Sequence, residues 1–165
     1  MIPQILRARQ NGIVIPVRAY RAARKAGIPY PVACAFLVQE SAGGQNVFGH
    51  DPMKSQRAYN LLAGKPVTPE LYLRYKRHRD EWGMQGVGPM QLTWWEFQDE
   101  ADRNGGCYVP YPNMLVAFTI LAGYRAAEGT WWDAARRYNG SGMAAEAYAD
   151  TVIKRIREWT RLIGE

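Results

Sequence analysis

The chain has 165 residues, 47% of them hydrophobic, which is enough for one good core and short for two independent domains. No apolar run approaches the ~20 residues that span a bilayer, and the first residues lack the apolar stretch of a signal peptide, so we expect synthesis in the cytoplasm and no membrane insertion. The net charge of +6 favours a polyanionic partner, namely nucleic acid, a membrane surface or an anionic cell wall, without choosing among them.

Apolar residues recur mostly at helical spacing, and no long alternating run indicates an extensive sheet, so the sequence predicts a mostly α-helical domain. A first helix is predicted over residues 16–26, opened by a proline and closed by a glycine. The most apolar early helix covers residues 32–40, after two prolines and before a glycine pair. Residues 45–52 are rich in turn formers and are predicted as a loop, with a very small β element left open.

Residues 53–82 are predicted as an inserted pair of helices, 55–63 and 69–80, which could form one wall of a groove. The second helix carries the densest run of basic residues, and such a run could follow phosphates along one helix face. We favour a solvated amphipathic helix with Tyr72 and Tyr75 packed inward, because no nucleic-acid motif accompanies the charge.

Four further helices are predicted over residues 93–103, 114–127, 131–138 and 144–162. Thr93 and Glu96 have the spacing of a capping box at the start of the helix 93–103. Thr130 and Asp133 have the same spacing at the start of the helix 131–138. The helix 114–127 is apolar enough for a central core element, and the helix 144–162, with Tyr148 on its apolar stripe, is interpreted as structural.

The cysteines and histidines give no metal signature. Cys34 and Cys107 make neither a disulfide framework nor a metal cluster, and we interpret both as buried thiols, with a bridge between them left open. His50 has no partner cluster, so we expect a hydrogen-bonded loop residue, no metal and no cofactor.

Glu40 is the strongest candidate for chemistry. It lies at the end of the apolar helix, and Phe36 and Leu37 share its face. Desolvation and the negative end of the helix dipole both disfavour the carboxylate, so we expect a pKa raised toward the value that a general acid needs. An exposed Glu near a helix end is the alternative.

Three segments in this order carry a family pattern: Glu40-Ser41 at a helix end, residues 86–93 with the letters GVGPMQLT, and Arg137-Tyr138-Asn139-Gly140. Together they resemble the catalytic Glu-Ser, the Gly-Leu-Met-Gln segment and the Ala-Tyr-Asn segment of the lysozyme-like superfamily, which contains goose-type lysozymes and soluble lytic transglycosylases. Residues 46–51, 91–97 and 130–140 resemble more closely the central lysozyme-like domain of mycobacteriophage endolysins, over about residues 31–157.

The resemblance implies a lysozyme-like helical fold, a bacterial peptidoglycan substrate and action on the cell wall after synthesis in the host cytoplasm, within an endolysin that could carry further domains. It implies Glu40 as the general acid and places Met90, Gln91, Tyr138 and Asn139 in the substrate groove. The amide and hydroxyl groups of the last three suit a neutral sugar polymer. Two tryptophan pairs, at 94–95 and 131–132, could stack on sugars, and adjacent helical positions predict that one member of each pair packs in the core.

The general base is less well defined. Asp51, eleven positions after Glu40, resembles an Asp of the goose-type pattern and could activate water. Thr93 stands where that pattern has its second Asp; it could help to position the water, although we favour the capping role. Glu70 and Glu81 are reserve candidates for the base.

We therefore predict a single lysozyme-like domain over residues 1–165 that cleaves peptidoglycan glycan strands as a muramidase-type glycoside hydrolase. A hydrolase with inversion would place its two carboxyl groups roughly 6.5 to 9.5 Å apart. The first alternative is a lytic transglycosylase, which needs one acidic side chain and forms anhydro-muramyl products. A non-catalytic glycan-binding module and a basic nucleic-acid binder are the other two.

Overall fold

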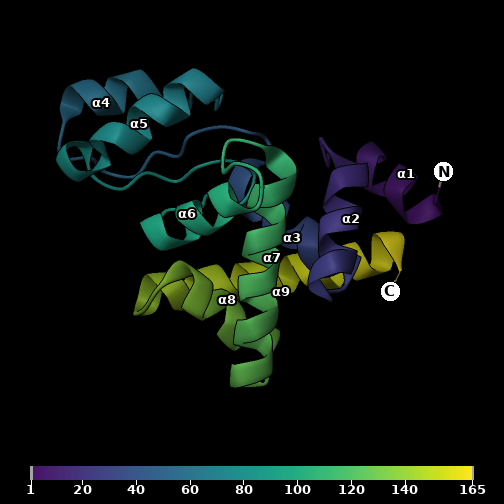
Figure 1. Cartoon of the computed structure of the whole chain (residues 1–165). Coiled ribbons are helices and arrows are strands. Elements are labelled where there is room, and N and C mark those ends of the chain that lie inside the picture. Colours follow the sequence, from purple (N-terminus) through teal and green to yellow (C-terminus); the bar gives the residue numbers. More distant parts are fainter. Residues whose placement is uncertain (1, 165) are drawn as a thin grey trace.

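Helices dominate the structure, as the spacing of apolar residues predicts. The computed structural model describes residues 2–164, and within them nine helices hold 67% of the chain and no sheet forms (Figure 1). The helices are α1 (Pro3–Gln10), α2 (Pro16–Ala26), α3 (Tyr30–Ser41), α4 (Gln56–Leu62), α5 (Pro69–Trp82), α6 (Trp95–Arg103), α7 (Pro110–Glu128), α8 (Trp131–Asn139) and α9 (Met143–Ile163). The mostly α-helical class is therefore confirmed.

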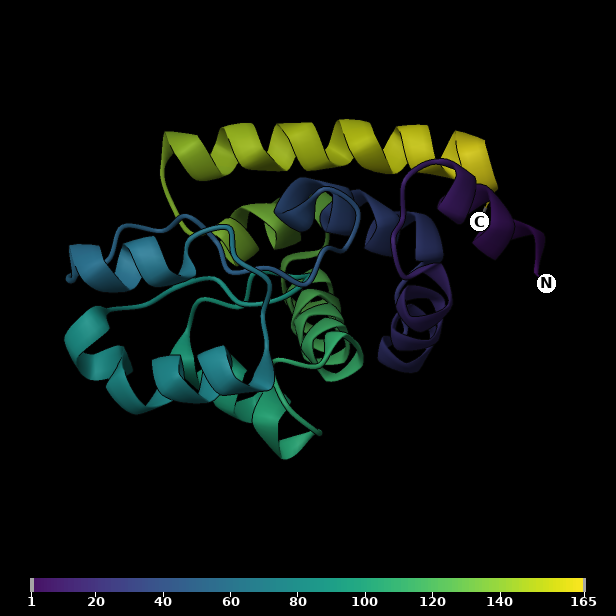
Figure 2. The same ribbon diagram turned by 90° about the horizontal axis from the view of Figure 1, so that it is seen from above.

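The apolar helix that ends at Glu40 lies at the centre of the fold. Every residue of α3 from Tyr30 to Leu37 is buried, and the helix packs against α2 and α9. Helix α7, which is also largely apolar, packs against α2, α6 and α8. Figure 2 shows α9 as a long rod along one side of this assembly, with α1 near its C-terminal end. A helix that is apolar on all faces is stable only when buried. Because the continuously buried part of α3 ends at Leu37, its last turn lies where the core meets a cleft.

Helix α1 precedes the helix that the sequence predicts as the first, and the starts of α6 and α7 also differ from the prediction. Helix α7 begins at Pro110 rather than Met114, because the first turn needs no N–H donors and therefore accepts its prolines. Helix α6 begins at Trp95 without a side-chain cap, while the Thr93 hydroxyl donates to the Gln91 carbonyl at 3.1 Å. The predicted capping role of Thr93 is therefore wrong. The capping interaction of Thr130 with the Asp133 amide is present, at 3.0 Å.

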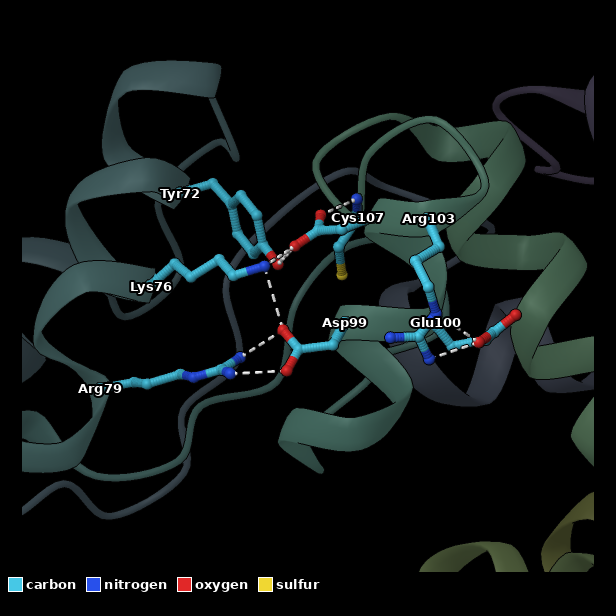
Figure 3. Close-up of polar contacts among 8 residues, drawn as sticks. Tyr72, Lys76, Arg79, Asp99, Glu100, Arg103 and Cys107 are labelled. Carbon is cyan, nitrogen blue, oxygen red and sulfur yellow. Dashed lines mark hydrogen bonds and ion pairs between the residues drawn. The ribbon is translucent and has the colours of Figure 1, made fainter.

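The inserted pair α4 and α5 forms a separate layer over α6 (Figures 1 and 2). Tyr72 and Tyr75 of α5 are fully buried, which confirms the amphipathic interpretation of the basic helix. Ion pairs join the layer to α6: Asp99 accepts from Arg79 at 2.7 Å and contacts Lys76 at 3.0 Å (Figure 3). Lys76 also pairs with Asp102.

The small β element left open by the sequence is reduced to isolated antiparallel bridges. They join Val47 to Pro66, Phe48 to Val87, and Val87 to Leu92. The Phe48–Val87 bridge holds the loop after α3 against the segment before α6, and both segments contribute to the cleft described below.

The two cysteines are free and buried, as predicted. Burial raises the pKa of each thiol, Cys34 and Cys107, to about 12, which keeps both protonated at neutral pH. Among residues 2–164, none of the helices combines the length and the apolar character that crossing a bilayer requires.

Candidate active site

Most of the predicted site residues meet in one open cleft of about 550 Å³. Its walls come from the end of α3, the loop after it, the segment before α6, and the end of α8. The lining residues are Glu40, His50, Asp51, Met84, Gln91, Leu92, Thr93, Trp94, Phe97, Tyr138 and Asn139. Segments about 100 residues apart in the sequence thus converge on a single hollow.

Glu40 lies half-buried in the last turn of α3 and lines the cleft. Burial raises the pKa of its carboxyl from 4.5 to about 7, with a further increase from the charge of Asp51. The Tyr148 hydroxyl of α9 donates to Glu40 Oε1 and partly offsets this increase. The raised pKa predicted from the sequence is confirmed, and desolvation is its main cause.

Asp51 is held in the cleft by its neighbours. The Gly86 amide donates to Asp51 Oδ2 at 2.8 Å, and the Asp51 amide donates to Gln85 Oε1 at 3.1 Å. A Cβ at Gly86 would lie 3.1 Å from Asp51 Oδ2 and 2.7 Å from Gln91 Oε1, so a residue without a side chain is needed here. In the described part of the chain Asp51 Oδ1 has no hydrogen-bond partner, which leaves it open to water or substrate.

Gln91 holds the cleft together rather than presenting donors to a ligand. Its Nε2 donates to the carbonyls of Val47 at 3.0 Å and Gly88 at 2.9 Å. Its backbone adopts a φ of 48°, which non-glycine residues rarely do and which marks a constrained position. Both amide hydrogens are already used within the protein, so donation by Gln91 to a sugar would require one of these hydrogen bonds to break.

Tyr138 and Met90 form a second structural contact beneath the cleft. The Tyr138 hydroxyl donates to the Met90 carbonyl at 2.8 Å, and its ring meets Phe36 edge-on at 5.9 Å. The side chain of Met90 is fully buried and does not line the cleft, contrary to its predicted place in the substrate groove. Ser41 fixes the same segment by donating to the Pro89 carbonyl at 2.6 Å. Helices α3 and α8 thereby set the position of residues 86–93.

The free polar and aromatic groups lie at the rim. Asn139 is exposed at the end of α8, and its amide has no hydrogen bond within residues 2–164. Trp94 is 59% exposed and Trp95 is half-buried outside the core cluster, whereas Trp131 and Trp132 are both half-buried and both pack against the core, so the prediction of one core member in each pair is not confirmed. His50 is exposed and makes no hydrogen bond in the described chain, contrary to expectation.

The reserve carboxylates lie outside the cleft. Glu70 is exposed in the first turn of α5, and Glu81 contacts His78 at 3.7 Å. Among the described residues, the insertion 53–82 contributes no side chain to the cleft lining, although His50, Asp51 and Met84 flank it. Within residues 2–164, Asp51 is therefore the one carboxylate besides Glu40 that lines the cleft.

Tyr148 is a site residue that the sequence analysis missed. It belongs to the apolar stripe of α9, and its partner Glu40 lies 108 positions earlier. A tyrosine on an apolar stripe carried no local signal of this contact. Burial and the charge of Glu40 raise the pKa of Tyr148 well above its ordinary value, so its hydroxyl remains a donor.

No family model, curated protein or solved structure matches this chain in comparisons with known proteins. Within residues 2–164, no group of three or more His, Cys, Asp or Glu side chains converges in a way that could hold a metal ion. The cleft contains two carboxyl groups of different character: Glu40, which can hold a proton near neutral pH, and Asp51, which has a free oxygen.

Proposed function

We propose that the protein cleaves the glycan strands of bacterial peptidoglycan as a muramidase-type glycoside hydrolase, in the manner of a mycobacteriophage endolysin. The observation that carries the proposal is a half-buried Glu40 with a pKa of about 7 in a cleft that also contains Asp51. Glycoside cleavage needs one carboxyl group that keeps its proton at working pH, and environment rather than residue type provides it. The resemblance of three sequence segments to the lysozyme-like superfamily supports the same choice.

In the proposed reaction Glu40 protonates the leaving glycosidic oxygen. Because the Tyr148 hydroxyl donates to Oε1, the acidic proton is placed on Oε2. At pH 7 a carboxyl group with a pKa of about 7 is about half protonated. Glu40 can therefore donate its proton and take up another after each reaction. As the bond breaks, the proton passes to the leaving sugar and the Tyr148 hydrogen bond stabilises the resulting carboxylate.

Asp51 acts as the base in this proposal. Its Oδ2 is fixed by the Gly86 amide, and its free Oδ1 accepts a proton from the water that attacks the anomeric carbon. Thr93 also lines the cleft, and its hydroxyl donates to the Gln91 carbonyl, so its oxygen can still accept a hydrogen bond from that water. This keeps for Thr93 the water-positioning role that the sequence left open.

The rim of the cleft suits a neutral sugar polymer. Trp94 and Met84 are exposed apolar surfaces over which a sugar ring can lie, and the Asn139 amide can bond hydroxyl or N-acetyl groups. The cleft is open rather than enclosed, as a polymer requires. The same proposal places synthesis in the host cytoplasm and action on the cell wall.

Mass spectrometry of digested peptidoglycan tests the reaction and its alternatives together. The wild type is expected to release fragments with reducing sugar ends, and Glu40→Gln to lower the release rate by about 10² to 10⁴. Glu70→Gln is the matched control, because Glu70 is exposed and lies outside the cleft. Fragments with anhydro-muramyl ends would identify a lytic transglycosylase instead of a hydrolase. An unchanged rate of fragment release by Glu40→Gln would reject Glu40 as the acid. Binding without any release by the wild type would favour a glycan-binding module.

A further inference from the structure

The basic run of α5 divides into two faces with different partners. Lys76 and Arg79 face α6 and both pair with its Asp99 (Figure 3). Lys76 pairs with Asp102 of the same helix as well. Arg74 and His78 are one turn apart and line a pocket between α5 and α4 instead. The sequence run is therefore not one continuous basic stripe.

The pocket between α4 and α5 has a volume of about 200 Å³. Arg57 of α4 and Arg74 of α5 both line it, and neither forms an ion pair within residues 2–164. Arg74 lies over the Trp82 ring at 5.8 Å, and His78 stacks on the same ring at 5.0 Å. Two guanidinium groups without a carboxylate partner thus share one concave site with an aromatic wall.

The local charge favours an anion even though Glu81 also lines the pocket. The Glu81 side chain is 77% exposed and contacts His78 at 3.7 Å, so solvent screens much of its charge. The two guanidinium groups exceed this single carboxylate by one positive charge, without counting His78. Guanidinium groups bind the oxygens of phosphate in a bidentate manner, and the Ser55 hydroxyl at the same pocket can donate a further hydrogen bond.

We propose that the α4–α5 pocket binds a phosphate group, carried by an anionic polymer of the cell wall. The phosphate chemistry follows from Arg57, Arg74 and the pocket, whereas the wall as its source depends on the proposed function. A nucleic acid fits less well, because binding along a backbone needs a row of free cations and two of those on α5 are neutralised by α6. The site would hold the enzyme on the wall at a place separate from the catalytic cleft.

Titration with inorganic phosphate tests the pocket without any glycan substrate. Nuclear magnetic resonance at constant ionic strength is expected to show a saturable shift of the Trp82 indole N–H, because Trp82 forms one wall of the pocket. Arg57→Gln/Arg74→Gln should weaken phosphate binding by about tenfold or more, and Arg77→Gln, an exposed neighbour outside the pocket, should change it less than about twofold. The two single variants replace the double variant should it fail to fold. No saturable shift, or equal binding by all variants, would overturn the proposal.

Sedimentation with cell walls tests the source of the phosphate. The protein with Glu40→Gln, which leaves the walls undigested, should pellet with intact walls and less so after acid removal of phosphodiester-linked polymers. Arg57→Gln/Arg74→Gln in that background should remove the difference between the two wall preparations. Pelleting that ignores phosphodiester removal, or tight duplex DNA binding that requires both arginines, would overturn the wall assignment. Phosphate binding does not depend on glycan cleavage, so its failure and that of the hydrolase proposal are distinguishable.

Discussion

Replacing Glu40 by Gln should remove activity and stabilise the fold, and the gain should depend on pH. Folding raises the pKa of Glu40 from 4.5 to about 7, so the folded chain holds this proton more tightly than the unfolded chain. The stability of the wild type therefore falls as pH rises from about 4.5 to about 7 and stays lower above that range. Burial of the carboxylate is the physical reason.

The magnitude follows from the linkage between proton binding and folding. Each unit by which the pKa of Glu40 differs between the folded and the unfolded chain corresponds to about 1.4 kcal/mol of stability, so the full pKa shift corresponds to about 3 kcal/mol. Glutamine is neutral at all pH values and keeps an oxygen that can accept from Tyr148. Because Glu40 is half-buried and solvent screens part of the effect, we expect Glu40→Gln to gain about 2 kcal/mol at pH 8 and little at pH 4.

Urea denaturation followed by circular dichroism at both pH values measures this gain. For a chain of this length about 2 kcal/mol corresponds to roughly 4 to 8 °C in Tm. Glu70→Gln, at an exposed position of α5, should change stability by less than about 0.5 kcal/mol. A variant no more stable than the wild type at pH 8, or equally stabilised at both pH values, would show that burial does not raise the pKa of Glu40.

Three other predictions concern the groups around Glu40. Tyr148→Phe removes a hydrogen bond that lowers the pKa of Glu40, so the alkaline limb of the pH–rate profile should shift to higher pH while the rate at pH 5 falls about tenfold. A shift of that limb to lower pH would refute this role. Asp51→Asn should lower the rate of hydrolysis by about 10² to 10⁴ and, because it removes a negative charge near Glu40, shift the same alkaline limb to lower pH. An unchanged hydrolytic rate would exclude Asp51 as the base. Gly86→Ala should cost about 1 to 3 kcal/mol in thermal denaturation because its Cβ would meet Gln91 Oε1 at 2.7 Å, whereas Gly123→Ala in α7, with nothing within 4 Å, should stabilise; equal effects would contradict the close packing.

Gln91 and Met90 make contacts within the protein that the sequence did not show. The sequence placed Gln91 and Met90 in the cleft region but could not say which of their groups are already bonded. The side-chain amide of Gln91 donates to the carbonyls of Val47 and Gly88, and the Met90 carbonyl accepts from the Tyr138 hydroxyl. Hydrogen-bond partners from distant segments decide such roles, and residue type does not reveal them.

The sequence by itself determined the helical class, most helix positions and the apolar surroundings that raise the pKa of Glu40, because helical periodicity and capping are local properties of the chain. The tertiary structure alone decided that Tyr148 meets Glu40, that Asp51 shares its cleft, and that the basic run of α5 has a paired and an unpaired face. Contacts of this kind join residues tens of positions apart, and they exist only once the packing of α3, α5 and α9 has brought those residues together.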